Sequence, residues 1–75
     1  MNEQIREFIT RMFTKHGGNP VFSDTENVIY LNVGLNEGYV QDIFTQSGLK
    51  KFEIGTQYEY DPEQNGWKYT RVARY

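Results

Sequence analysis

The chain has 75 residues, a formal net charge of −2 and no cysteine. This length predicts one small domain, residues 1–75, and the missing cysteines exclude a disulfide framework, a thiolate metal site and a cysteine nucleophile. No apolar run is long enough to span a membrane and the N-terminus lacks a signal-peptide pattern, so we expect a cytoplasmic protein without membrane contact.

Residues 2–16 predict an amphipathic helix. Apolar side chains recur there with the spacing of one helical face, at Ile5, Phe8, Ile9, Met12 and Phe13. Asn2 is a suitable N-cap, and the glycines at positions 17 and 18 would end the helix.

Two short strands are predicted next, at residues 20–24 and 28–33, with a turn between them. Pro20 places the first of these strands at a sheet edge, because proline cannot donate a hydrogen bond to a central ladder. The second strand is apolar on both faces, which is typical of a central strand.

Residues 36–47 predict a second helix, which Asn36 would cap and Gly48 would end. We expect its buried face to consist of Tyr39, Val40, Ile43 and Phe44.

The last third of the chain predicts a long β-hairpin with arms at residues 51–60 and 67–75. Both arms alternate with period 2, and the connection at residues 61–66 contains Asp-Pro and Asn-Gly, which favour turns. A loop of that length places Tyr60 opposite Trp67, Tyr58 opposite Tyr69, Glu59 opposite Lys68 and Glu53 opposite Arg74. Aromatic side chains then face aromatic ones, and opposite charges face each other.

These elements predict an α+β fold of order α-β-β-α-β-β, with one four-stranded antiparallel sheet of strand order 1-2-4-3 and both helices on one face. The other face, which includes Val72, is expected to be solvated and charged. Residues 12–17 resemble residues 43–48, and residues 28–33 resemble residues 67–72, so an internal αββ repeat is a hypothesis.

The tip of the hairpin is the first candidate contact surface. A strand of ten residues spans about 33 Å, whereas the helices span only about 17 and 22 Å. One interpretation leaves an exposed aromatic cluster of the residue types that dominate binding hot spots, Tyr58, Tyr60, Trp67 and Tyr69. In the other, the first helix slants across the tip and buries it.

The second candidate surface is the acidic middle of the chain. Residues 16–49 contain no lysine or arginine, and their four carboxylates are Asp24, Glu26, Glu37 and Asp42. A surface of that charge would suit a basic partner. It would equally be ordinary solubilising surface.

Basic residues interleave with the aromatic residues of the hairpin, which is how single-stranded nucleic-acid-binding modules hold a strand. The residues that would serve this alternative function are Lys50, Lys51, Lys68, Arg71 and Arg74. The lack of an overall basic excess argues against it.

No residue pattern predicts catalysis, a metal site or a cofactor. His16 is the only histidine, and no paired carboxylates or glycine-rich phosphate loop stand out. We therefore expect a chain that is not an enzyme.

The favoured function is a small non-enzymatic protein-binding domain. A short, acidic, tyrosine-rich chain resembles in type the early proteins that phages and mobile elements encode to block host enzymes. That resemblance implies an inhibitor of a host protein, and the acidic middle suggests a basic, nucleic-acid-handling partner. A homodimer, formed through the uncovered sheet face or the tip, is a further hypothesis.

Overall fold

The computed structural model describes residues 1–23, 25–32 and 34–75. The elements follow in the predicted order: α1 (Glu3–Lys15), β1 (Val21–Ser23), β2 (Val28–Leu31), α2 (Glu37–Ser47), β3 (Glu53–Asp61) and β4 (Gly66–Arg74). The four strands form one antiparallel sheet of order β1-β2-β4-β3. The predicted fold is therefore confirmed, and the inner strands of the two αββ halves, β2 and β4, lie side by side.

The ends of α1 are set by the predicted residues. The Asn2 side chain accepts a hydrogen bond of 2.8 Å from the amide of Ile5. At the other end Gly17 takes a φ of 81°, and the amide of Gly18 donates to the carbonyl of Phe13 at 2.8 Å. This is the glycine-dependent helix stop in which backbone amides satisfy the last carbonyls.

Helix α2 follows the same rules. The Asn36 side chain accepts a hydrogen bond of 2.8 Å from the amide of Tyr39, and Gly48 ends the helix with a φ of 90°. Leu35 before the helix and Leu49 after it both pack against the core, so the chain is held on each side of α2.

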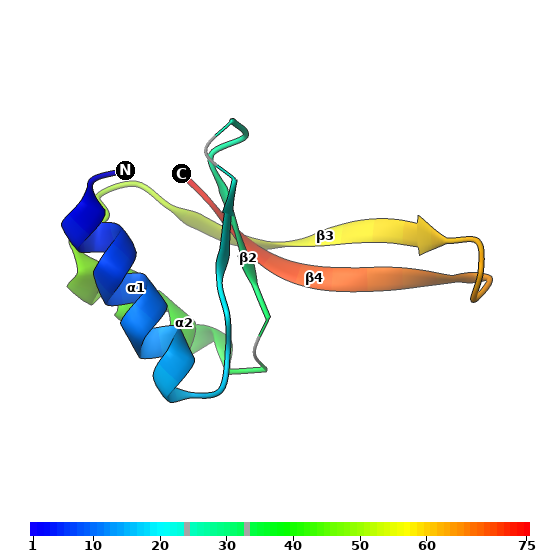
Figure 1. Cartoon of the computed structure of the whole chain (residues 1–75), viewed down its shortest axis with the longest axis horizontal. Coiled ribbons are helices and arrows are strands. Elements are labelled where there is room, and N and C mark those ends of the chain that lie inside the picture. Colours follow the sequence, from blue (N-terminus) through cyan, green and yellow to red (C-terminus); the bar gives the residue numbers. More distant parts are fainter. Residues whose placement is uncertain (24, 33) are drawn as a thin grey trace.

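The core lies between the two helices and one face of the sheet, at the end of the molecule away from the hairpin turn (Figure 1). Its central contact joins the helices, because the rings of Phe13 and Phe44 are 6.0 Å apart between centroids. The buried residues of the core cluster are Ile9, Phe13, Ile29, Leu31, Val40, Ile43, Phe44 and Ala73.

Tyr39 was predicted to belong to this core, and that prediction is wrong. The Tyr39 side chain is 40% exposed. It lies about 100° around the helix from Val40, at the margin of the apolar stripe. Its ring instead meets His16 at the end of α1, edge to face, with His16 Nε2 and the Tyr39 hydroxyl 2.7 Å apart.

The face of the sheet opposite the helices is not wholly solvated, because Val72 is fully buried. Its neighbours across the sheet are Tyr30 on β2 and Gly55 on β3. A methyl group on Gly55 would lie 3.0 Å from Nη1 of Arg74, so the arginine side chain lies over the glycine. Across the sheet, the small Val72 side chain therefore has Tyr30 on one side and, on the other, Gly55 with the Arg74 side chain over it.

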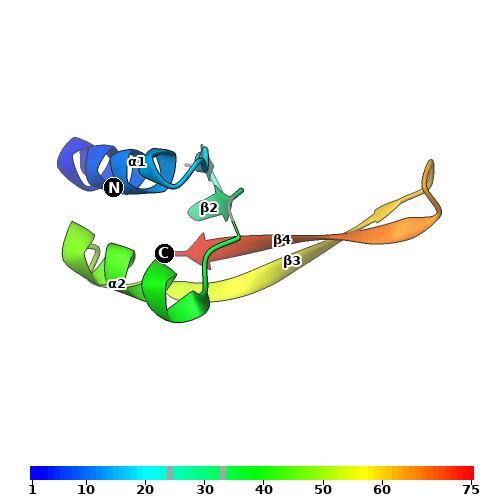
Figure 2. The same ribbon diagram turned by 90° about the horizontal axis from the view of Figure 1, so that it is seen from below.

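Strands β3 and β4 have nine residues each, whereas β2 has four and pairs with β4 only from Arg74 to Arg71. Beyond Arg71 the sheet continues as two strands, residues 57–61 and 66–70, joined by a turn at residues 62–65. We call this part, residues 57–70, the ribbon. Figures 1 and 2 show it extending away from both helices, and it accounts for much of the 39 Å long axis of the molecule.

Candidate functional site

Four large aromatic side chains share one face of the ribbon and form two cross-strand pairs. The rings of Tyr58 and Tyr69 lie 5.1 Å apart, and those of Tyr60 and Trp67 lie 5.4 Å apart, both edge to face. Their exposed fractions are 62% for Tyr58, 46% for Tyr60, 59% for Trp67 and 68% for Tyr69. We call these four residues the aromatic cluster.

The cluster is exposed because the ribbon extends beyond the part of the sheet that the helices cover. Its residues lie on the same face of the sheet as Ile54 on β3 and Ala73 on β4. Those two residues are nearer the base of the hairpin, where they pack in or against the core. Both helices lie at that base, and neither reaches the ribbon (Figure 2). The exposed-tip interpretation is therefore right, and the alternative in which α1 covers the tip is wrong.

The turn at the end of the ribbon is held by its own polar groups. The Asp61 side chain accepts a hydrogen bond of 3.1 Å from the amide of Glu63, and Asn65 takes a φ of 49°. The Tyr60 hydroxyl donates to Oδ1 of Asn65 at 2.6 Å. One ring of the aromatic cluster is thereby fixed to the turn, which lowers the entropy that it would lose on binding.

The opposite face of the ribbon is polar and carries a net negative charge. The ribbon contains Glu59, Asp61 and Glu63 but only one cation, Lys68. The predicted register is confirmed, since Glu59 lies opposite Lys68. The ion pair of Lys68 is nevertheless with Asp61, at 3.2 Å, and not with Glu59.

The basic residues of the nucleic-acid alternative do not gather around the aromatic cluster. Lys50 and Lys51 precede β3, and Arg74 ends β4, so all three lie at the base of the hairpin. The Arg71 guanidinium donates a hydrogen bond to the carbonyl of Leu35, which ties the hairpin to the start of α2.

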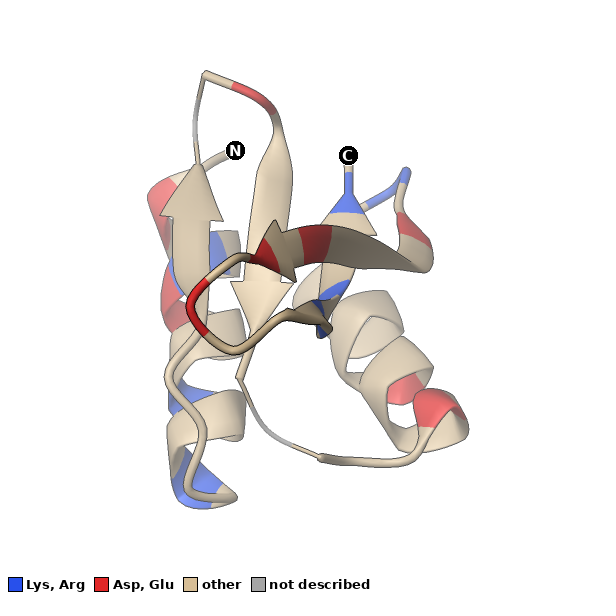
Figure 3. Cartoon of the chain, turned by 90° about the vertical axis from the view of Figure 1, so that its right-hand side faces the viewer, with Lys and Arg blue, Asp and Glu red and all other residues tan. Residues whose placement is uncertain are grey.

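The acidic middle of the chain does not form one surface among the described residues. Glu26 lies in the turn between β1 and β2, whereas Glu37 and Asp42 lie on α2, beyond the other end of β2. Figure 3 shows acidic residues on this turn, on the ribbon and on α2, well separated from one another. Asp24 lies outside the described residues.

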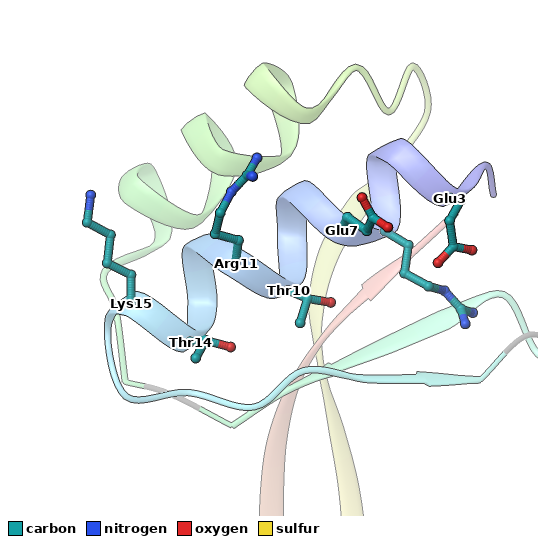
Figure 4. A pocket seen from close by; sticks show the side chains of 7 residues that line it. Glu3, Glu7, Thr10, Arg11, Thr14 and Lys15 are labelled. Carbon is teal, nitrogen blue, oxygen red and sulfur yellow. The ribbon is translucent and has the colours of Figure 1, made fainter.

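Several hollows on the surface were not predicted from the sequence, and two of them lie at α1 and at the end of β2. One runs along the outer side of α1, where Figure 4 shows its side chains, but all seven lining residues belong to that helix and no second element forms a wall. The other lies where β2 leaves the sheet, and its lining residues are Leu31, Asn32, Gly34, Tyr69, Thr70 and Arg71. The second hollow adjoins the aromatic cluster through Tyr69.

Chemistry-bearing side chains are scattered over the part of the chain that the structure describes. Within residues 1–23, 25–32 and 34–75, no three side chains of histidine, aspartate or glutamate come together in a way that could hold a metal ion. No helix among these residues has the length and apolar character needed to cross a membrane. The aromatic cluster is the surface feature that calls for a functional explanation, because most large apolar side chains elsewhere pack in or against the core.

Comparison with models of known protein families found no match, and comparison with curated proteins and with solved structures found none either.

Proposed function

We propose that this chain is a small non-enzymatic protein-binding domain whose contact surface is the aromatic cluster. The observation that carries the proposal is the exposure of four tyrosine and tryptophan rings, between 46% and 68%, on a ribbon that projects from the core. Tyrosine and tryptophan are enriched in binding hot spots because they offer a large apolar area and lose few rotamers. A contiguous apolar patch kept in water is typical of an interaction site.

The charges of the ribbon favour a protein over a nucleic acid as the partner. Three carboxylates and one lysine give the ribbon a net charge of −2, and that lysine is already paired with Asp61. Phosphate groups would be repelled there, whereas aromatic stacking on a nucleic-acid strand requires basic side chains beside the rings. A basic protein surface would be attracted instead.

The finer form of the proposal is an inhibitor of phage or mobile-element type that blocks a basic, nucleic-acid-handling host protein. Two features support it: the small size and acidity of the chain, and a contact surface that projects far enough to enter a cleft of a larger protein.

The proposal is tested by substitutions in the aromatic cluster. Wild type, Trp67→Ala and Tyr69→Ala are immobilised, proteins from the source cells are captured, and the affinity of each retained protein is then measured by titration. Tyr39→Ala is the matched control, because Tyr39 is also exposed but lies on α2. We expect Trp67→Ala to weaken binding by about 2 kcal/mol or more, which is about a 30-fold rise in Kd.

Retention of the same partners at unchanged affinity by both cluster variants would contradict the proposal. A labelled single-stranded oligonucleotide, mixed with the protein at low salt, is expected to show no shift on a gel. A shift that Trp67→Ala abolishes would favour the nucleic-acid alternative.

A further inference from the structure

Strand β3 is an edge strand along its whole length. Its nine residues pair one to one with β4, from Glu53 opposite Arg74 to Asp61 opposite Gly66, and no bulge interrupts the ladder. The outer backbone N–H and C=O groups of β3 therefore have no strand beside them.

Several of the usual protections of an exposed edge are missing from β3, although it does carry the carboxylates of Glu53, Glu59 and Asp61. Edge strands in native proteins commonly carry a lysine, a proline or a bulge, each of which hinders pairing with another chain. The nine residues of β3, all of which the structure describes, include no lysine, arginine or proline. Figure 2 also shows that neither helix lies beside the outer part of β3, which extends away from both.

The two faces of β3 differ sharply in chemistry. Ile54, Tyr58 and Tyr60 lie on one face, and the carboxylates of Glu53, Glu59 and Asp61 lie on the other. Lys68 is paired with Asp61, and among the described residues neither Glu53 nor Glu59 forms an ion pair. An added strand would thus meet apolar rings and unpaired carboxylates on alternate sides.

From this arrangement we infer that the β3 edge binds an extended segment of the partner protein by strand addition, and that the segment alternates apolar with basic residues. Backbone hydrogen bonds supply affinity in this mode, and the alternating side chains supply specificity. The inference rests on the proposed function, because it specifies how a protein partner meets the ribbon. A segment that reaches from Glu53 to Glu59 spans about 20 Å, which about seven residues cover.

A second copy of this chain is a poor occupant of the same edge in two of the antiparallel registers open to it. Two antiparallel copies of β3 that keep their aromatic faces together and pair around Gln57 place Glu53 opposite Asp61 of the other copy. Pairing around Thr56 places Glu53 opposite Glu59. Like charges directly opposite each other destabilise a sheet, so the carboxylates that disfavour self-pairing favour a basic strand.

The test uses a fluorescent synthetic peptide with as many residues as β3, nine, in which lysine alternates with valine or phenylalanine. Binding to the full chain is measured by fluorescence anisotropy. We expect saturable binding of the lysine peptide and none of a peptide with glutamate in place of lysine. Glu59→Lys is expected to weaken binding about tenfold, whereas Glu26→Lys, the same charge change in the β1–β2 turn, leaves it unchanged.

Two N-methylated versions of the lysine peptide identify the binding mode. One carries methyl groups on one alternate set of backbone amides, and the other carries them on the remaining set. Only one set points at the β3 edge in a strand-addition complex, so one version is expected to lose binding and the other to keep it. Amide hydrogen exchange of the bound protein should slow in β3.

Strand addition at β3 is overturned if both methylated versions bind equally, or if the added protection appears in β4 alone. It is likewise overturned if the lysine peptide fails to bind, or if sedimentation shows that the chain forms a dimer at the β3 edge. If these results occur while Trp67→Ala still loses the native partner, the proposed function stands and only the binding mode falls. If instead the lysine peptide binds while Trp67→Ala keeps the native partner, the strand-addition mode stands and the proposed function of the aromatic cluster falls.

Discussion

Val72 and Trp67 lie on the same strand, five residues apart, in opposite surroundings. Val72 is fully buried, whereas Trp67 is 59% exposed. At Val72 strand β4 is central, with Tyr30 on one side and Gly55 on the other. At Trp67 the only neighbouring strand is β3, and the ring lies edge to face against Tyr60. Val72 thus has a flanking strand on each side, whereas Trp67 has one on a single side.

Val72→Lys should consequently behave as a core substitution. The side chain lies on the face without helices, but a lysine ammonium there has to displace Arg74 from above Gly55 or lose its own hydration. We expect a loss of about 2 kcal/mol in the free energy of unfolding, measured by urea denaturation followed by circular dichroism. Thr70→Lys, on the same face and strand but only half-buried, is the control and should cost far less. Equal and small losses for both variants would show that Val72 is open to water.

The two helices and the base of the sheet form the folding core. Phe44 of α2 touches Phe13 of α1 and Phe52 before β3, at centroid distances of 6.0 and 5.3 Å. One ring thus joins three segments that are distant in the sequence. With so short a chain, few other residues can replace that contact.

Phe44→Ala should therefore cost about 3–5 kcal/mol in stability, since it leaves a cavity at the centre of this contact. A domain of this size can unfold altogether at such a cost. Thermal or urea denaturation gives the result directly, and Tyr58→Ala on the exposed ribbon is the control, with little expected loss. If Phe44→Ala unfolds at the same urea concentration as wild type, the packing between α1 and α2 described above is wrong.

The ribbon, by contrast, should be dispensable for folding. Deleting residues 57–60 and 67–70 joins Thr56 to Asp61 and Gly66 to Arg71, and it keeps the register of the remaining hairpin. We expect the shortened chain to keep its circular dichroism spectrum and its stability within about 1 kcal/mol, because an isolated two-stranded ribbon contributes little stability of its own. A shortened chain that is unfolded would show that the ribbon belongs to the core.

The arrangement of elements could be predicted from the sequence because several local signals agree. Asn2, Asn36, Gly17 and Gly48 mark the helix ends, and the pairing of aromatic and charged residues fixes the hairpin register. The predictions for Tyr39 and Val72 were wrong because a local sequence pattern does not show which residues from other elements lie beside a side chain. Periodicity placed Tyr39 on the buried face of α2, although it lies at the edge of that face and contacts His16.

The candidate site could be predicted in part for the same reason. Strand and helix lengths indicated that the hairpin extends beyond the helices. The exposure of the aromatic cluster also depends on the direction of α1 across the sheet, which is set by packing throughout the core. The hollow beside Tyr69 depends on where β2 leaves the sheet, and no local sequence signal marks that point.

Taken whole, the molecule separates stability from recognition. The helices and the base of the sheet hold nearly all of its buried side chains, and the ribbon carries exposed aromatic side chains and a net negative charge. Because few residues serve both roles, substitutions on the ribbon should alter binding and substitutions in the core should alter folding.

Fluorescence of Trp67 tests that division most directly, because Trp67 is the only tryptophan and reports one position on the ribbon. In the free protein the emission should lie at the long wavelengths of a hydrated indole, and acrylamide should quench it readily, since the side chain is 59% exposed. On binding the partner the emission should shift to shorter wavelengths as the ring loses water. Short-wavelength emission from the free protein, together with resistance to quenching, would show that the ring is already buried and that the contact surface lies elsewhere.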